Sequence, residues 1–146
     1  MTFDESSLSL GTYPPNGYGG LNWVGFKVEN SAASRYAVSG QEIVSGTQAA
    51  YVSDSAYFYL KSNTSSFSLY SGYFSAYATD GLILTANVLS NDAVNAVIAT
   101  ATFTLKYNQA NIYTFPSVFS RINIVQFDTS DGTPFVMDNL LVALNH

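Results

Sequence analysis

The chain contains no cysteine and one histidine, and charged residues make up only 10% of it. Without cysteine there can be no disulfide bond, thiolate metal ligand or cysteine nucleophile. The histidine, His146, is the last residue, which argues against a histidine-dependent catalytic triad or a histidine metal site. These absences remove several common kinds of catalytic and metal centre from consideration.

Basic residues are scarce as well. The net charge is −5, and the five basic residues are scattered along the chain: Lys27, Arg35, Lys61, Lys106 and Arg121. Binding to a phosphate backbone requires a cluster of lysine and arginine side chains. We therefore expect no nucleic-acid partner.

No apolar run is long enough to span a membrane, and the opening segment Met1–Leu10 lacks the basic start and apolar stretch of a signal peptide. A surface built from Ser, Thr, Asn, Gly and Tyr instead of charged residues is typical of secreted or cell-surface β proteins. We expect a mature, exported form from which the leader has been removed and to which Met1 has been added.

Period-two alternation of apolar and polar residues is the main structural signal, and helical periodicity is nearly absent. The clearest example is the segment Val97–Tyr107, in which one side is apolar and the other is mostly threonine. Such a segment predicts an antiparallel strand with one face in the core and one in solvent. The residues predicted to face the core are Val97, Ala99, Ala101, Phe103, Leu105 and Tyr107.

The same alternation predicts further strands, and turn residues separate them. The other predicted strands are Leu21–Val28, Ala49–Val52, Ala56–Lys61, Ser66–Tyr70, Tyr73–Ala78, Leu82–Leu89, Ser120–Phe127 and Phe135–Leu144. Many short strands separated by turns predict an all-β fold, a two-sheet antiparallel β-sandwich of the jelly-roll type, in a single domain over residues 1–146. A hairpin through Ser90–Ala93 and a tight turn at Asp80-Gly81 predict three consecutive paired strands in one sheet.

Acidic residues near the two ends of the chain suggest a cation site. Asp138 lies in a strand whose two faces are both largely apolar, where a carboxylate is costly unless it is paired or coordinated. Terminal strands of a jelly roll are neighbours, which would bring Asp4 and Glu5 close to Asp138. Calcium takes about six to eight oxygen ligands, so these three residues are candidate ligands of a structural Ca²⁺. The alternative, left open, is that Asp138 accepts backbone hydrogen bonds and Asp4 is exposed in a frayed end.

The segment Tyr13–Trp23 combines prolines, glycines, two tyrosines and the only tryptophan of the chain. Aromatic rings and amide side chains on a loop are typical of a sugar-binding site. Tyr13, Asn16, Tyr18 and Asn22 are therefore candidate ligand-binding residues, and Tyr13 and Tyr18 are expected to be exposed. For Trp23 we favour packing in the core.

A second aromatic cluster follows in the middle of the chain. Alternation places Tyr57 and Tyr59 on one side of their strand, and Tyr73 and Tyr77 on one side of the next. A solvent-facing row of tyrosines would form a platform for a sugar, with Tyr77 as a candidate. Cross-strand aromatic pairs also stabilise sheets in the absence of any ligand, and that interpretation is favoured.

Short segments spread over most of the chain carry a family resemblance: Phe3-Asp4, Pro15–Phe26, Ser34–Tyr36, Ile43–Gly46, Phe67–Leu82 and Phe135–Leu140. They resemble a group of secreted β-sandwich proteins of fungi and bacteria, the bacterial ones often sorted to the cell surface, for which no function is stated. The chain departs from this group at Arg35, where the group has Gly, and at Tyr77, where it has Trp. In outline it is also similar to calcium-containing jelly-roll carbohydrate-binding modules, which implies that Asp4 and Asp138 hold the ion.

The leading functional prediction is a non-catalytic, lectin-like secreted protein that binds a glycan. One rival is a structural or surface protein, such as an effector or coat component, that binds another protein; the oligomeric state is left open. A second rival is a polysaccharide lyase or hydrolase, although no spacing of acids singles out a catalytic pair.

Overall fold

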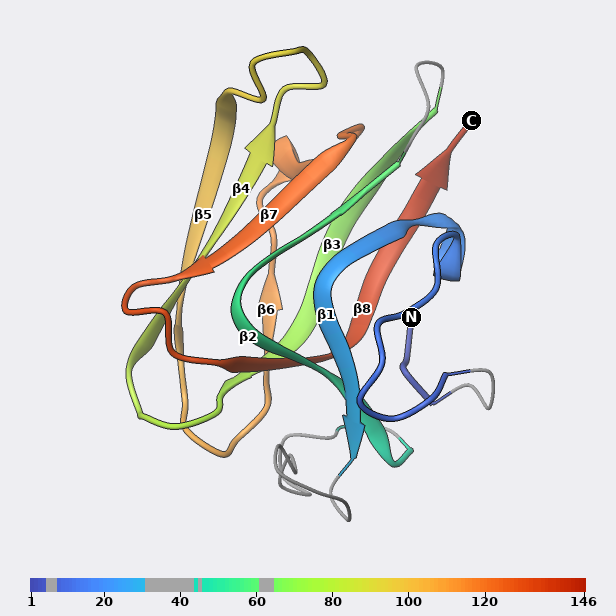
Figure 1. Ribbon diagram of the computed structural model, residues 1–146. Coiled ribbons are helices and arrows are strands. Elements are labelled where there is room, and N and C mark those ends of the chain that lie inside the picture. Colours follow the sequence, from blue (N-terminus) through green and yellow to red (C-terminus); the bar gives the residue numbers. More distant parts are fainter. Residues whose placement is uncertain (5–7, 31–43, 45, 61–64) are drawn as a thin grey trace.

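The computed structural model describes residues 1–4, 8–30, 44, 46–60 and 65–146. This part of the chain contains eight strands and two short 3₁₀ helices (Figure 1). The strands are β1 (Asn22–Asn30), β2 (Gln48–Tyr59), β3 (Ser66–Ala76), β4 (Leu82–Leu89), β5 (Val97–Leu105), β6 (Asn111–Thr114), β7 (Ile124–Thr129) and β8 (Phe135–Asn145). The 3₁₀ helices are η1 (Tyr18–Gly20) and η2 (Ser117–Phe119).

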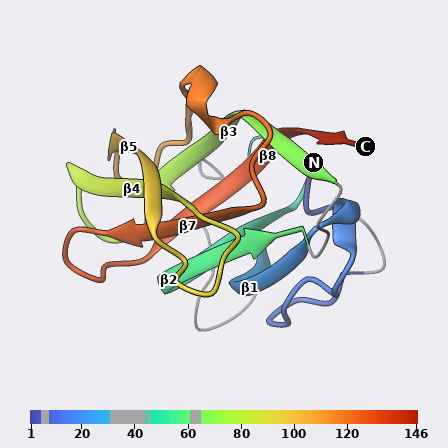
Figure 2. The same cartoon turned by 90° about the horizontal axis from the view of Figure 1, so that it is seen from above.

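Strand β2 passes from one layer of the fold into the other (Figures 1 and 2). Its residues Ala56–Tyr59 pair with β7, whereas Ala50–Val52 pair with β8. The first sheet therefore has the order β5–β4–β7–β2–β1, and the second sheet has the order β6–β3–β8–β2–β1. All these ladders are antiparallel, which confirms the predicted two-sheet antiparallel sandwich of the jelly-roll type.

Strand β1 bends together with β2 because its register shifts between Val24 and Phe26. The residue at the shift, Gly25, has a φ of +85°, and a Cβ there would lie 2.7 Å from the carbonyl oxygen of Ser55. Only glycine fits this close approach of two backbones. The shift places both Trp23 and Phe26 in the core.

The core between the sheets is dominated by phenylalanine. Phe58 from the first sheet, Phe74 from the second and Phe127 from β7 are fully buried, with ring centroids 5.7 Å apart for Phe58 and Phe127 and 5.9 Å apart for Phe74 and Phe127. Burial of each such ring contributes on the order of 2 kcal/mol. Trp23 is also buried, and its Nε1 donates to the Tyr18 carbonyl at 2.9 Å, which confirms its predicted place in the core.

The predicted row of three consecutive strands in one sheet is wrong. β4 pairs with β5 and β7, while β3 pairs with β8 and β6, so the chain crosses from the second sheet to the first at Asp80-Gly81. This crossing is held by the end of β5 and the residues after it: the Gly81 N–H donates to the Leu105 carbonyl at 3.0 Å, and Asp80 Oδ1 accepts from the Tyr107 N–H at 3.1 Å. The hairpin of β4 with β5 is confirmed.

Some strand details also differ from the predictions. Two pairs of predicted short strands are each one long strand, β2 and β3, and the short β6 was not predicted. Val97 and Tyr107 were expected in the core but are 57% and 52% exposed. For Val97 the reason is a register shift beside Leu89, which turns the end of β5 outward.

The first and last described segments lie side by side, as predicted. The Met1 amino group donates to the Leu140 carbonyl, and the Leu140 N–H donates to the Met1 carbonyl at 2.9 Å. Within the described residues, no helix is long and apolar enough to cross a membrane.

Candidate functional site

The outer face of the first sheet carries a row of side chains that runs across its strands. Register partners in a sheet project to the same side, and the pairing links one residue from each strand in turn. We call this set the cross-strand row: Val24, Tyr57, Gln126, Asn87 and Thr100. It combines an aromatic ring, two amides and a hydroxyl on one surface.

Hydrogen bonds fix the polar members of the cross-strand row. Thr100 Oγ1 donates to Asn87 Oδ1 at 2.8 Å. Gln126 Nε2 donates to Asp128 Oδ1 at 3.2 Å and to Ser55 Oγ at 3.3 Å. Asn87 Nδ2 lies 3.5 Å from the other oxygen of Asp128. The amides are thus oriented before any ligand arrives, which lowers the entropy lost on binding.

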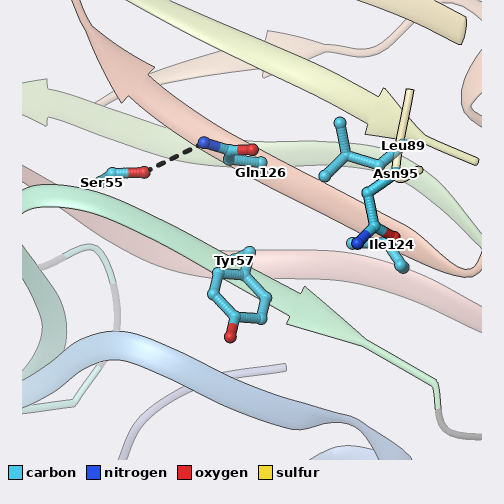
Figure 3. Close-up of a pocket in the computed structure, with 6 residues that line it drawn as sticks. All are labelled: Ser55, Tyr57, Leu89, Asn95, Ile124 and Gln126. Carbon is cyan, nitrogen blue, oxygen red and sulfur yellow. Dashed lines mark hydrogen bonds between the residues drawn. The ribbon is translucent and has the colours of Figure 1, made fainter. Parts of the chain in front are cut away.

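A hollow of about 570 Å³ lies at the end of this face that adjoins the β4–β5 loop. It is lined by Ser55, Tyr57, Leu89, Asn95, Ile124 and Gln126. Figure 3 shows Gln126 beside Ser55, Tyr57 projecting from the neighbouring strand, and Leu89, Ile124 and Asn95 gathered at the other end. Tyr57 is 40% exposed at the hollow, and its ring contacts that of Tyr59, with ring centroids 6.0 Å apart.

The β4–β5 loop holds Asn95 at the rim of this hollow. Asn95 has a positive φ of 49°, a conformation that asparagine tolerates better than most residues. Asp92 Oδ1 accepts from the Ser90 hydroxyl at 2.8 Å and from the Val94 and Asn95 N–H groups at 3.0 and 3.1 Å. These bonds, first of all that from Ser90, hold the pKa of Asp92 below its usual value.

A second hollow, of about 540 Å³, is lined by Tyr13, Pro14, Asn16, Trp23, Val24 and Gly25. Tyr13 is 59% exposed, and the Lys27 Nζ lies 6.0 Å from the centre of its ring. Backbone hydrogen bonds between the segment before Tyr13 and Val28 fix this segment against β1. The predicted candidates Tyr13 and Asn16 therefore lie together at a concave surface.

The other predicted ligand-binding residues lie elsewhere. Tyr18 is buried, not exposed as expected, because its ring packs against Phe3 and its hydroxyl donates to the Thr2 carbonyl. Asn22 is half-buried at the end of β1, where it pairs with Tyr59 of the first sheet. Tyr77 packs edge-on against Tyr51, with ring centroids 5.0 Å apart, on the outer face of the second sheet.

Two of the three predicted metal ligands, Asp138 and Asp4, accept hydrogen bonds from backbone N–H groups. Asp138 is fully buried, and its Oδ2 accepts from the Val44 N–H at 2.8 Å. Asp4 Oδ1 accepts from the N–H groups of Thr47 and Gln48 at 2.7 and 2.9 Å, so Asp4 is not part of a frayed, exposed end. Glu5 lies outside the described residues. Among those that are described, no group of three or more metal-ligating side chains comes together.

Sequence reasoning missed most of the cross-strand row. Alternation does place Gln126, Asn87 and Thr100 on the outward sides of their strands, but their pairing with one another depends on strand order. β7 inserts between β2 and β4, although it follows them by several dozen positions in the chain. No local signal in the sequence reports such long-range pairing.

No family model matches the chain, and no curated protein matches it. Among solved structures, it is similar to a CBM4 structure with a TM-score of 0.48 and 14% identity, over 85% of this chain and 87% of the other. It is similar to TmCBM61 in complex with β-1,4-galactotriose with a TM-score of 0.43 and 11% identity, over 84% and 87%.

A third similar structure is the enzymatically active domain of tailspike protein 4 of bacteriophage CBA120. Its TM-score is 0.44 and its identity 13%, over 85% of this chain but only 19% of the other. The first two neighbours are carbohydrate-binding modules and the third is an enzyme domain. Similarities at this level do not carry the neighbours' functions over to this chain.

Proposed function

We propose that this chain binds a neutral glycan, without cleaving it, on the outer face of its first sheet. The observation that carries the proposal is the cross-strand row, in which the exposed ring of Tyr57 neighbours the pre-positioned amide of Gln126, and Gln126 in turn neighbours Asn87. The proposal thus rests on this chain's own residues.

The chemistry of the face suits a sugar. A pyranose ring offers an apolar face of C–H groups and a rim of hydroxyls that both donate and accept hydrogen bonds. An exposed tyrosine ring can cover the apolar face, and a primary amide can donate to one hydroxyl while accepting from another. A flat aromatic in one row with two amides therefore meets both requirements of the ligand.

The charge on the face favours an uncharged glycan. Asp128 lies beside Gln126 and Asn87, the described members of the cross-strand row include no basic side chain, and the net charge of the chain is −5. Uronate or sulfate groups would meet a like charge here, which slows association and weakens binding. We expect neutral polysaccharides to be retained and anionic ones to be excluded.

Native affinity electrophoresis tests this proposal. The gels would contain neutral glucan, galactan, xylan or mannan in one set, and alginate or polygalacturonate in another. We expect at least one neutral gel to retard the protein, and Tyr57→Ala to abolish the retardation. Tyr70→Ala, which removes a ring 48% exposed on β3 of the second sheet, is the matched control. Free migration in every neutral gel, or equal losses in both variants, would overturn the proposal.

The rival function in protein binding has one supporting observation. Val94, Val97 and Ile98 are 78%, 57% and 64% exposed around the tip of the β4–β5 hairpin. If a Val94→Ser, Ile98→Ser variant lost a protein partner or a dimer while wild-type protein ignored every glycan, this rival would replace the proposal. A lyase or hydrolase would instead release soluble fragments from the retained polysaccharide, which product analysis would detect.

Secretion, membership of the fungal and bacterial group and a structural Ca²⁺ stay predictions. Asp138 accepts from the Val44 N–H and Asp4 from the Thr47 N–H, and such contacts fit a structural role of the two carboxylates, since calcium takes oxygen ligands. A midpoint of thermal unfolding that falls in EDTA and recovers with calcium would support the ion. An unchanged midpoint would leave both carboxylates with the structural role of binding backbone N–H groups.

A further inference from the structure

We propose that the two hollows are parts of one binding track, so that the ligand is an extended, linear glycan chain lying across the strands. This inference rests on the proposed function and adds the shape and length of the ligand. Two observations join the hollows, and a third gives the direction of the track.

The first observation is a register pair. Val24 lines the hollow beside Tyr13, Tyr57 lines the hollow beside Gln126, and the two residues are direct cross-strand partners. Side chains of such partners project to the same face with their Cβ atoms about 5 Å apart. At 39% and 40% exposure they form a low apolar boundary between the hollows, over which a chain can pass.

The second observation is a backbone contact beneath this boundary. Gly25 lines the hollow beside Tyr13, and a Cβ at Gly25 would lie 2.7 Å from the carbonyl oxygen of Ser55, which lines the other hollow. The Ser55 hydroxyl in turn accepts from Gln126. The floor of one hollow is therefore continuous with the wall of the other.

The third observation is the direction in which the groups follow one another. From Tyr13 the outward-facing groups pass to Val24, Tyr57 and the half-buried Gln126, and then to the half-buried Asn87 on β4. Adjacent strands lie about 4.8 Å apart, so the part between β1 and β4 alone extends roughly 14 Å. A terminal sugar fills only one end of such a track, whereas an internal stretch of a linear chain contacts both aromatic groups.

Binding of oligosaccharides of increasing length tests the inference. The probes are the trimer and hexamer of cello-, laminari-, xylo- and β-1,4-galacto-oligosaccharides, measured by isothermal titration calorimetry. For the series that binds, we expect the hexamer to bind at least tenfold more tightly than the trimer. Tyr13→Ala should remove most of that difference and leave the trimer affinity unchanged, while Tyr57→Ala weakens both and Tyr70→Ala weakens neither.

A second measurement covers the case in which Tyr13→Ala perturbs the loop. In ¹⁵N-edited NMR spectra of the wild-type protein, we expect the Gly25 amide to shift with the hexamer but not with the trimer. Equal affinities of trimer and hexamer, with Gly25 unmoved, would overturn the continuous track but leave the glycan site at Tyr57 intact. Absence of binding by every probe would overturn both proposals.

Discussion

The outer faces of the two sheets differ sharply although β1 and β2 contribute to both. On the first sheet, Tyr57 is 40% exposed among polar side chains that are hydrogen-bonded at the surface. On the second sheet, a patch formed by Tyr51, Val136 and Asp138, which we call the closed face, is at most 4% exposed, although Tyr70 elsewhere on β3 is 48% exposed. Both faces contain a pair of tyrosines, so aromatic content alone does not distinguish a binding surface from a packing surface. A binding surface is distinguished from a packing surface by the exposure of its rings and by hydrogen bonds that fix the neighbouring amides.

The largest effect that we predict concerns the closed face. Asp138→Ala should lower the free energy of unfolding by about 3 kcal/mol, because the N–H groups of Val44 and Asn139 lose their charged acceptor. Urea unfolding measures this loss. The glycan affinity of the folded variant should stay within twofold of wild type, since the carboxylate lies on the opposite face from the cross-strand row.

Asp138→Asn is the matched variant for this prediction, because an amide retains an acceptor oxygen of nearly the same shape. It should recover part of the lost stability. If Asp138→Ala were as stable as wild type, the carboxylate would not be what stabilises the closed face. If it lost affinity without losing stability, the separation of the two faces proposed here would be wrong.

The second prediction concerns the open face, by which we mean the outer face of the first sheet that carries the cross-strand row. Gln126→Ala should weaken binding of the retained glycan about tenfold, or about 1.4 kcal/mol, because it removes one amide and frees its two acceptors, Asp128 and Ser55. Its free energy of unfolding should change by less than about 0.5 kcal/mol, as is usual at surface positions. Calorimetry and urea unfolding check the two parts, and a loss of stability as large as that of Asp138→Ala would show that the open face is also structural.

The sequence predicted the features that depend on local patterns but not those that depend on strand order. Alternation is a local property, so β4, the hairpin of β4 with β5 and the inward position of Trp23 were all predictable. Strand order is not local. The pairing of Tyr57 with Gln126, which creates the candidate site, depends on β7 joining the sheet between β2 and β4.

The prediction that Tyr18 is exposed was wrong for a related reason. The loop of Tyr13 and Tyr18 has the composition of a binding site, but only Tyr13 reaches solvent. Tyr18 lies in a 3₁₀ turn whose fold directs its ring onto Phe3 and Trp23. Which of two nearby tyrosines packs inward depends on its partners in the tertiary structure, and the sequence alone does not predict these partners.

The third prediction concerns the pH dependence of the free energy of unfolding, which we attribute to Glu29. Glu29 is 3% exposed, and burial raises its pKa, partly opposed by the charge of Lys27. A carboxyl whose folded pKa lies above its unfolded pKa binds more protons when folded. Its contribution to stability is therefore full below the unfolded pKa and is lost as the pH rises through the folded pKa.

Glu29→Gln removes this titration and should raise the free energy of unfolding at pH 7 by about 1 kcal/mol. The difference from wild type should disappear near pH 4, where the wild-type carboxyl is largely protonated when folded. Urea unfolding across this range measures it, and Asp92→Asn on the exposed hairpin loop is the contrast. The pKa of Asp92 is lowered, so its substitution should destabilise the protein at pH 7 instead. A gain from Glu29→Gln that is constant with pH would contradict the assignment to Glu29.

The smallest predicted effect tests whether the hydrogen bonds of the open face matter for binding. Thr100→Val keeps the shape of the side chain but removes the hydroxyl that fixes Asn87 at 2.8 Å. We expect stability to change by less than about 0.5 kcal/mol and glycan affinity to fall about threefold, because the amide regains rotational freedom that binding must then remove. Thr102→Val removes the same group from the next outward position of β5 and should leave affinity unchanged. Equal losses of glycan affinity in the two variants would mean that the threonine hydroxyls contact the ligand. A loss of affinity confined to Thr100→Val would show that the orientation of Asn87 distinguishes the open face from an ordinary polar surface.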